Sequence, residues 1–128
     1  MIRNSILFFA CVVSLEVAAC PPAQHEACET MKWKKLEMSV INSNIANLNT
    51  TRSPSGGPYK RQVFRCKHAR CAVVSLKGSL LRYEPNHPDA NEDGYVTYPD
   101  INLSQEMSDM INASREYDEA AKVCLSKQ

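Results

Sequence analysis

The sequence predicts an α+β fold, in which two terminal helices form an antiparallel pair and a small β-rich hairpin region lies between them. Three observations support this prediction: apolar stripes with helical spacing over residues 28–48 and 102–125, and short runs of β-branched and aromatic residues between them. A chain of 128 residues has room for one small domain, and its formal net charge of +1 gives no sign of a nucleic-acid partner.

Residues 1–19 have the organisation of a secretory signal peptide. A basic start at Arg3 precedes an apolar stretch over residues 6–15 and the small residues Val17, Ala18 and Ala19. That stretch is shorter than the roughly twenty residues that a membrane-spanning helix needs. We therefore expect residues 20–128 to form a single exported domain that has no transmembrane helix.

Cys20 ends a Val-Ala-Ala-Cys segment that resembles a bacterial lipobox. Acylation of Cys20 would attach the mature chain to a membrane by lipid. Ordinary cleavage by signal peptidase near the same position remains the alternative. Small residues at these positions suit this peptidase as well as the enzymes that process lipoproteins. If the signal peptide removes Cys11 and lipid occupies Cys20, an even set of four cysteines is left in an oxidising compartment.

The four remaining cysteines allow three disulfide connectivities. Antiparallel terminal helices would bring Cys28 close to Cys124, and a hairpin would bring Cys66 close to Cys71, so we favour these two disulfides. Free cysteines on buried faces are one alternative. A metal site formed by His25, Cys28, Cys66, His68 and Cys71 is another, although the ligand spacing is not a recognised zinc pattern.

The first predicted helix covers residues 28–48 and ends where Asn47 and Asn49 tolerate left-handed backbone geometry. A Pro- and Gly-rich loop over residues 50–58 follows. The helix has a stripe of apolar residues at spacings near three and four: Met31, Met38, Ile41, Ile45 and Leu48.

The middle of the chain, residues 50–100, reads as loops and short strands. Residues 59–65 and 71–76 are expected to form a hairpin closed by the Cys66 to Cys71 segment. Residues 80–83 and 95–98 are expected to be further strands around the turn-rich segment 84–94.

The second helix is expected from Asn102 to about residue 125, because Asn102 and Gln105 have the spacing of a capping box. Its predicted stripe packs against the first helix: Leu103, Met107, Met110, Tyr117, Ala121 and Cys124.

Residues 89–100 carry oxygen-bearing side chains at the positions of an EF-hand loop, with glycine at position six. Pro85 and Pro88 exclude a normal entering helix, Pro99 disrupts the exit, and Asp100 replaces the usual glutamate. We therefore expect no calcium here. Neither a catalytic constellation nor a cofactor motif is present in the sequence, so we expect no enzyme and no cofactor.

Residues 36–50, LEMSVINSNIANLNT, resemble the N-terminal motif of flagellar axial proteins. The next segment, TRSPSGGPYKRQ over residues 51–62, resembles the loop particular to the flagellar basal-body rod protein FlgC family. Segments 83–96, 98–103 and 106–117 then follow in the order of that family. Together the matching blocks cover most of residues 20–128.

The resemblance implies a structural subunit of the proximal rod that supports motility, with the β-rich middle decorating a tube of paired helices. Its partners would be copies of itself or other basal-body proteins. The residues that would contact neighbouring subunits are Met38, Ile41, Asn44, Ile45, Asn47, Met107, Met110 and Tyr117.

Two features depart from the family: the signal peptide, because rod proteins usually leave through the flagellar export apparatus, and the cysteine-containing hairpin. They support an alternative, a periplasmic lipoprotein that keeps the rod-protein fold and binds a basal-body partner without polymerising. Glycosylation sequons at Asn49, Asn102 and Asn112 suggest a eukaryotic secreted domain, but the rod motifs argue against it.

Overall fold

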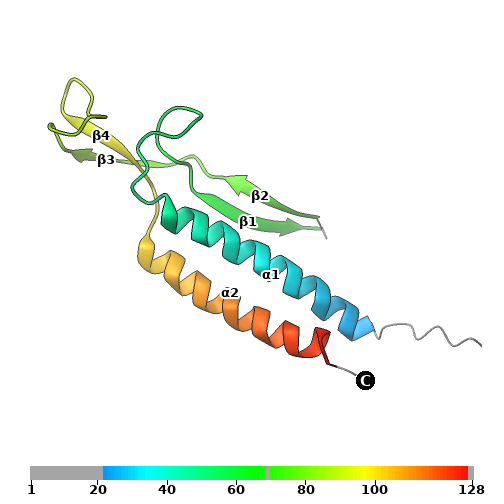
Figure 1. Cartoon of the computed structure of the whole chain (residues 1–128). Helices are drawn as coiled ribbons and strands as arrows, with labels where there is room; N and C mark the ends of the chain where they lie inside the picture. The colour runs from blue at the N-terminus through cyan, green and yellow to red at the C-terminus, as the bar shows by residue number, and fades with distance from the viewer. Residues whose placement is uncertain (1–21, 69, 127–128) are drawn as a thin grey trace, which may run out of the picture.

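A computed structural model describes residues 22–68 and 70–126, and it shows two long helices beside two β-hairpins (Figure 1). This arrangement confirms the α+β fold with paired terminal helices. None of the described helices is long and apolar enough to cross a membrane. The elements in chain order are α1 (Pro22–Ala46), β1 (Gln62–Lys67), β2 (Arg70–Ser75), β3 (Ser79–Tyr83), β4 (Tyr95–Pro99) and α2 (Leu103–Cys124).

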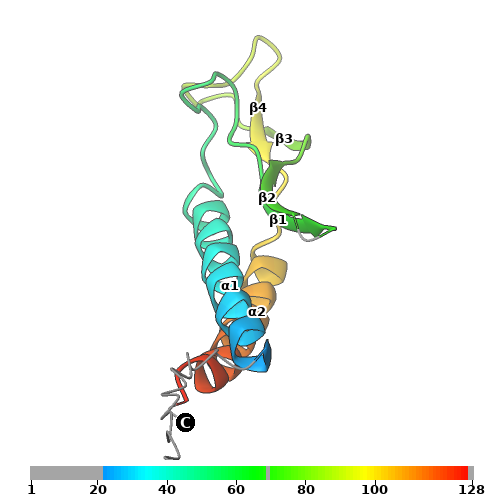
Figure 2. The ribbon, with the colours of Figure 1, turned by 90° about the vertical axis from the view of Figure 1, so that its right-hand side faces the viewer.

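The helices α1 and α2 lie side by side and antiparallel, and the hairpins lie to one side of the pair (Figure 2). The apolar core between the two helices is small. From α1 it takes Val40 and Ile41, and from α2 it takes Ala113 and Ala120. Alanine has no side chain beyond Cβ, so these two positions allow the helices to approach closely.

The first helix begins at Pro22, six residues before the predicted start. Proline is tolerated in the first turn of a helix, where its missing N–H would have no helical partner. The prediction was wrong because the apolar stripe begins only at Cys28. The helix ends at Ala46, and Asn47 Nδ2 then donates to the Ser43 carbonyl at 2.8 Å.

The hairpin β1–β2 is antiparallel, and Cys66 lies directly opposite Cys71. The first strand begins at Gln62 rather than at the predicted residue 59. The backbone N–H of Tyr59 is instead bonded to the Thr50 carbonyl at 3.0 Å, which belongs to the preceding loop. Phe64 of β1 stacks on Trp33 of α1 with ring centroids 5.9 Å apart, so this hairpin packs on the first helix.

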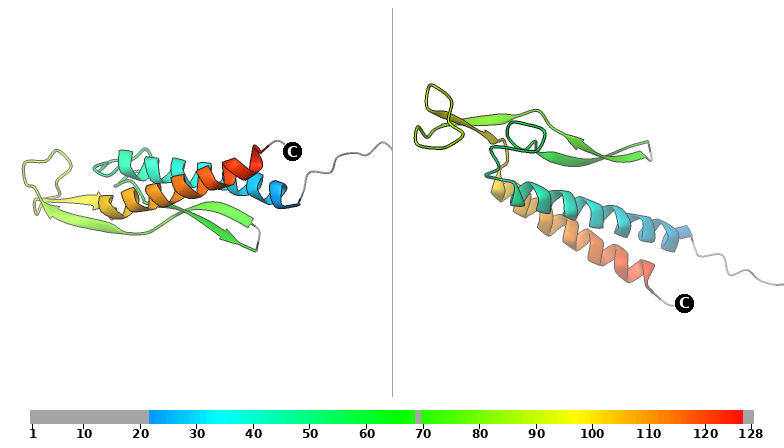
Figure 3. Two further views of the ribbon diagram at one scale, coloured as in Figure 1. Left: turned by 90° about the horizontal axis from the view of Figure 1, so that it is seen from below. Right: turned by 45° about the horizontal axis from the view of Figure 1, so that its top comes forward.

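The hairpin β3–β4 extends beyond the ends of the helices, with the turn 84–94 at its tip (Figure 3). Its two strands match the predicted segments to within one residue. Val96 and Tyr98 of β4 are buried, whereas β3 is exposed along its length.

The second helix begins at Leu103, and the side chain of its N-cap Asn102 accepts from the Gln105 N–H as predicted. The Gln105 side chain bonds Asp109 rather than completing a capping box. The predicted stripe needs correction: Leu103 and Met107 are exposed, and the buried positions of α2 are Glu106, Ala113 and Ala120. The buried face of α2 is therefore rotated from the predicted one and includes the charged residue Glu106. A search for periodic apolar residues does not find a buried glutamate.

Candidate functional site

A buried polar junction connects α1, α2 and the segment that enters β1. We define it by Asn44, Tyr59, Arg61, Gln62 and Glu106. Asn44 and Glu106 are each only 1% exposed. Asn44 Nδ2 donates to Glu106 Oε2 at 3.0 Å and to the Gln62 carbonyl at 2.8 Å.

The acceptor side of Asn44 is also occupied. Asn44 Oδ1 accepts from the Tyr59 hydroxyl at 3.1 Å and from the Gln62 N–H at 2.9 Å. The amide therefore uses its two donors and both lone pairs of its oxygen. Arg61 Nε donates to the second oxygen of Glu106 at 2.6 Å, which gives the buried carboxylate a cationic partner.

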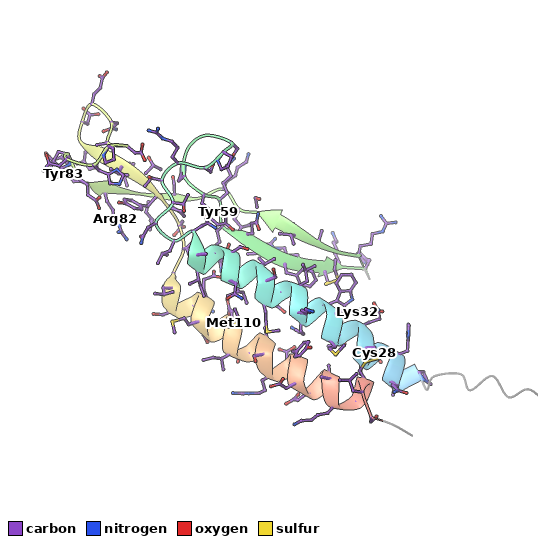
Figure 4. The ribbon with its side chains drawn as sticks, in the orientation of Figure 1. Cys28, Lys32, Tyr59, Arg82, Tyr83 and Met110 are labelled. Carbon is purple, nitrogen blue, oxygen red and sulfur yellow. A yellow bond between two sulfur atoms is a disulfide. The ribbon has the colours of Figure 1, made fainter. Side chains whose placement is uncertain are left out.

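The chemistry of the polar junction is that of a structural contact. Burial, and then the nearby negative charge of Glu106, raise the pKa of Tyr59, so its phenol stays neutral and donates. Among the described residues, every buried polar side-chain atom has a hydrogen-bond partner. The polar junction therefore fixes how the helix pair meets the β region (Figure 4).

The opposite end of the helix pair is closed by a disulfide between Cys28 and Cys124, with an S–S distance of 2.03 Å (Figure 4). Gln24 Nε2 adds a hydrogen bond to the Cys124 carbonyl at 3.0 Å. Between the two ends, Lys34 of α1 forms an ion pair with Glu116 of α2 at 2.8 Å. The helices are thus joined at both ends and between them.

The second disulfide joins Cys66 to Cys71 across β1–β2. Both pairings are the ones favoured from the sequence. In this structure all four cysteine sulfurs are bonded in pairs, whereas the metal-site alternative needs Cys28, Cys66 and Cys71 as free ligands. Within residues 22–68 and 70–126, no group of three or more His, Cys, Asp or Glu side chains could hold a metal ion.

Asp89 connects the loop after α1 to the turn 84–94. Its carboxylate accepts from Thr51 Oγ1 at 2.7 Å and pairs with Arg52. The hydrogen bond from Thr51, followed by the charge of Arg52, lowers the pKa of Asp89. The Asp89 N–H donates to His87 Nδ1 at 3.0 Å, so the histidine anchors this turn.

Two of the oxygen-bearing side chains of the EF-hand-like segment have partners within the chain. Asp89 is bound as described above, and Asn91 Oδ1 accepts the N–H groups of Asp93 and Tyr95 at 3.1 and 2.8 Å. These contacts shape a turn in which the side-chain oxygens of Asp89 and Asn91 bond to the chain itself.

The predicted subunit-contact residues fall into three groups. Ile41 and Asn44 are buried within the chain, so this conformation withholds them from a neighbour, which corrects that part of the prediction. Met107 is exposed. The others are half-buried: Met38, Ile45, Asn47, Met110 and Tyr117.

An exposed apolar face lies on α2, and of its three residues only Met107 was predicted from the sequence to contact a neighbouring subunit. It consists of Leu103, Met107 and Ile111, which are 41%, 54% and 59% exposed. Their spacing of four residues places them on one side of the helix and was the available signal. Exposed apolar side chains in a row suit packing against another helix.

Comparison with known proteins identifies clear relatives. The chain is 35% identical to the flagellar basal-body rod protein FlgC of Borreliella burgdorferi, over 74% of this chain and 82% of that protein. It is 33% identical to FlgC of Salmonella typhimurium, over 62% of this chain and 69% of that protein. It is 32% identical to FlgC of Aquifex aeolicus, over 69% and 74% respectively. No protein-family model matches the chain.

The paired helices, the polar junction and the exposed face of α2 define a structural protein built on a helical hairpin. The extent of the match to curated relatives shows that the chain belongs to the flagellar basal-body rod protein FlgC family. It is accordingly a structural component of the flagellar basal-body rod.

Proposed function

We propose that this chain is a non-catalytic rod subunit that packs against neighbouring subunits through Leu103, Met107 and Ile111. The exposure of these three side chains is the observation that supports the proposal. Covering them with a second helix would remove apolar area from water, at about 25 cal/mol per Å². The neighbours would be copies of the chain or other basal-body proteins.

The proposed compartment is the periplasm, reached by a signal peptide over residues 1–19. The proposed lipid anchor is Cys20. The signal peptide and Cys20 both lie outside the described residues. The first helix begins at Pro22, so lipid at Cys20 would hold the N-terminal end of α1 close to the membrane surface. Two acyl chains or more would give stable attachment, whereas one is marginal.

Motility tests the proposed function. A clean deletion should impair swimming, and the wild-type gene should restore it. M107E/I111E should be exported and folded but should fail to restore swimming, because charges replace the apolar face. S108E/N112E, at exposed positions of the same helix, is the matched control and should restore it. Normal swimming of the deletion strain would contradict the proposal.

A second candidate is a lipoprotein that binds a basal-body partner as a monomer. The Cys28–Cys124 disulfide favours it, because a covalent link between the helix ends restricts the repacking that polymer growth needs. A photo-cross-linker at Met107 separates the two candidates. Ladders of cross-linked copies would support the rod subunit, whereas a single product with another protein would support the monomeric lipoprotein.

A further inference from the structure

The net charge of the chain is only +1, but basic and acidic residues are concentrated in different segments of the sequence. Residues 38–83 contain eight Lys or Arg residues and no Asp or Glu. Residues 84–114 contain seven Asp or Glu residues and no Lys or Arg. The first segment includes the β1–β2 hairpin and the second includes the turn 84–94, so this hairpin and this turn carry opposite charges.

The basic charge gathers on the outer face of β1–β2. Phe64 faces α1 through its stack on Trp33, and side chains alternate along a strand, so Arg65 and Lys67 point away from the helices. Arg70 lies opposite Lys67 in the register and shares that outer face. We call Arg65, Lys67 and Arg70 the basic tip.

The three side chains of the basic tip are exposed, and none forms an ion pair with another described residue. Like charges directly opposite each other in a hairpin are destabilising, and Lys67 faces Arg70. The adjacent Cys66–Cys71 disulfide holds the two strands together despite this repulsion. A hollow on the same face is lined by the basic tip together with Ala72 and Val74.

The turn 84–94 offers a complementary surface. Glu92 and Asp93 are exposed there and form no ion pair within the described part of the chain. Beside them, Tyr83 and Tyr95 are 65% and 42% exposed, and their rings meet edge to face with centroids 5.3 Å apart. We call these four residues the acidic end. Carboxylates attract Lys and Arg, and exposed aromatic faces attract the same cations.

The basic tip and the acidic end cannot pair within one molecule. The β1–β2 tip and the turn 84–94 lie at opposite ends of the long axis (Figures 1 and 3), and Tyr83 marks the acidic end in Figure 4. Each surface therefore needs a second molecule, and every copy carries both surfaces.

We propose that the basic tip docks on the acidic end of a second copy of the chain. Such a head-to-tail contact is heterologous, so it produces rows of subunits rather than closed dimers. It rests on the proposed function and deepens it, because it adds an end-to-end contact to the lateral packing of α2. The charged groups are exposed, so salt should weaken the contact.

Charge reversal tests this proposal with the protein as the cell exports and processes it, purified in mild detergent. R65E/K67E/R70E makes both ends acidic, and E92K/D93K makes both ends basic. Sedimentation velocity at about 10 mM salt should show association of the wild type, which is lost near 500 mM where the Debye length is a few Å. Each variant alone should remain unassociated, and an equimolar mixture should associate again.

R115E/K122E is the matched control, because it reverses two exposed charges on α2 away from both ends and should associate like the wild type. Circular dichroism checks that every variant is folded. A mixture of folded variants that fails to associate would overturn the proposal. So would a wild type that binds vesicles of anionic phospholipid through the basic tip but not itself. Neither result touches the rod function, which the motility of the deletion strain tests separately.

Discussion

Glu106 of α2 hydrogen-bonds Asn44 of α1 at 3.0 Å, although the two residues are 62 positions apart and each is only 1% exposed. Arg61, which lies in the segment that enters β1, supplies the positive charge opposite the Glu106 carboxylate. The contact fixes the helix pair at the end from which the β region leaves, and the Cys28–Cys124 disulfide fixes the other end. The fold thus depends on specific contacts more than on a large apolar core.

Removing the carboxylate of Glu106 should destabilise the fold strongly. We expect Glu106→Ala to lower the free energy of unfolding by about 3 kcal/mol, because Asn44 and Arg61 lose a buried acceptor. Asp109→Ala, one turn further along α2, is the control and should cost under about 1 kcal/mol. Urea denaturation with the disulfides intact measures both. Equal midpoints for the two variants would contradict the role assigned to Glu106.

The two disulfides should contribute unequally to stability. Cys28→Ser/Cys124→Ser opens a loop with a sequence separation of 96, and Cys66→Ser/Cys71→Ser opens one with a separation of 5. The chain-entropy model predicts losses of about 4 to 5 and about 2 kcal/mol, respectively. Urea denaturation of the two double variants gives the order. The reverse order would show that strain or residual structure outweighs loop entropy.

The Asp89 contact should make stability depend on acid pH. The pKa of Asp89 is lowered in the folded chain, so the unfolded chain binds this proton at a higher pH than the folded chain does. The stabilisation is therefore present above the ordinary aspartate pKa of 3.8 and is lost as the pH falls below it. Asp89→Asn should be less stable than wild type near pH 6 and should approach it near pH 2. A difference that does not change with pH would count against the ionic contact.

Gly94 should tolerate substitution less well than Gly57. Both have positive φ, 81° and 73°, which costs an L-residue about 1 kcal/mol. At Gly94 an added Cβ would also lie 2.9 Å from Tyr83 Cε2 and 3.2 Å from Pro85 Cβ, whereas at Gly57 no atom lies within 4 Å. We expect Gly94→Ala to cost about 2 kcal/mol and Gly57→Ala about 1 kcal/mol. Thermal unfolding of the two variants checks this order.

Much of the fold could be predicted because its signals are local. The strands β3 and β4 are short segments with apolar and aromatic residues on either side of a turn-rich segment, and Asn102 caps α2 as its spacing suggests. Antiparallel packing of the two helices was enough to favour the pairing of Cys28 with Cys124. The start of α1 was missed because its first turns carry no apolar stripe, and Pro22 does not reveal a helix without one.

The polar junction could not be predicted, because its residues come together only in the folded chain. Glu106 is a charged residue that would normally be assigned to the surface, and only the donors of Asn44 and Arg61 make its burial favourable. Asn44 was expected at a subunit contact because it lies in the segment that resembles the motif of flagellar axial proteins. When the helix is oriented so that Glu106 is buried, Leu103 and Met107 face the solvent. They then form the exposed apolar face of α2 together with Ile111.

The most direct test of the central claim is whether the protein is present in the rod. Hook–basal bodies isolated from the native bacterium with detergent should contain the wild-type protein after the membranes are removed, detected by mass spectrometry. The folded S108E/N112E variant should also be retained, and folded M107E/I111E should be absent. If wild-type protein is missing from intact basal bodies and is recovered only with the solubilised membranes, the rod assignment is contradicted.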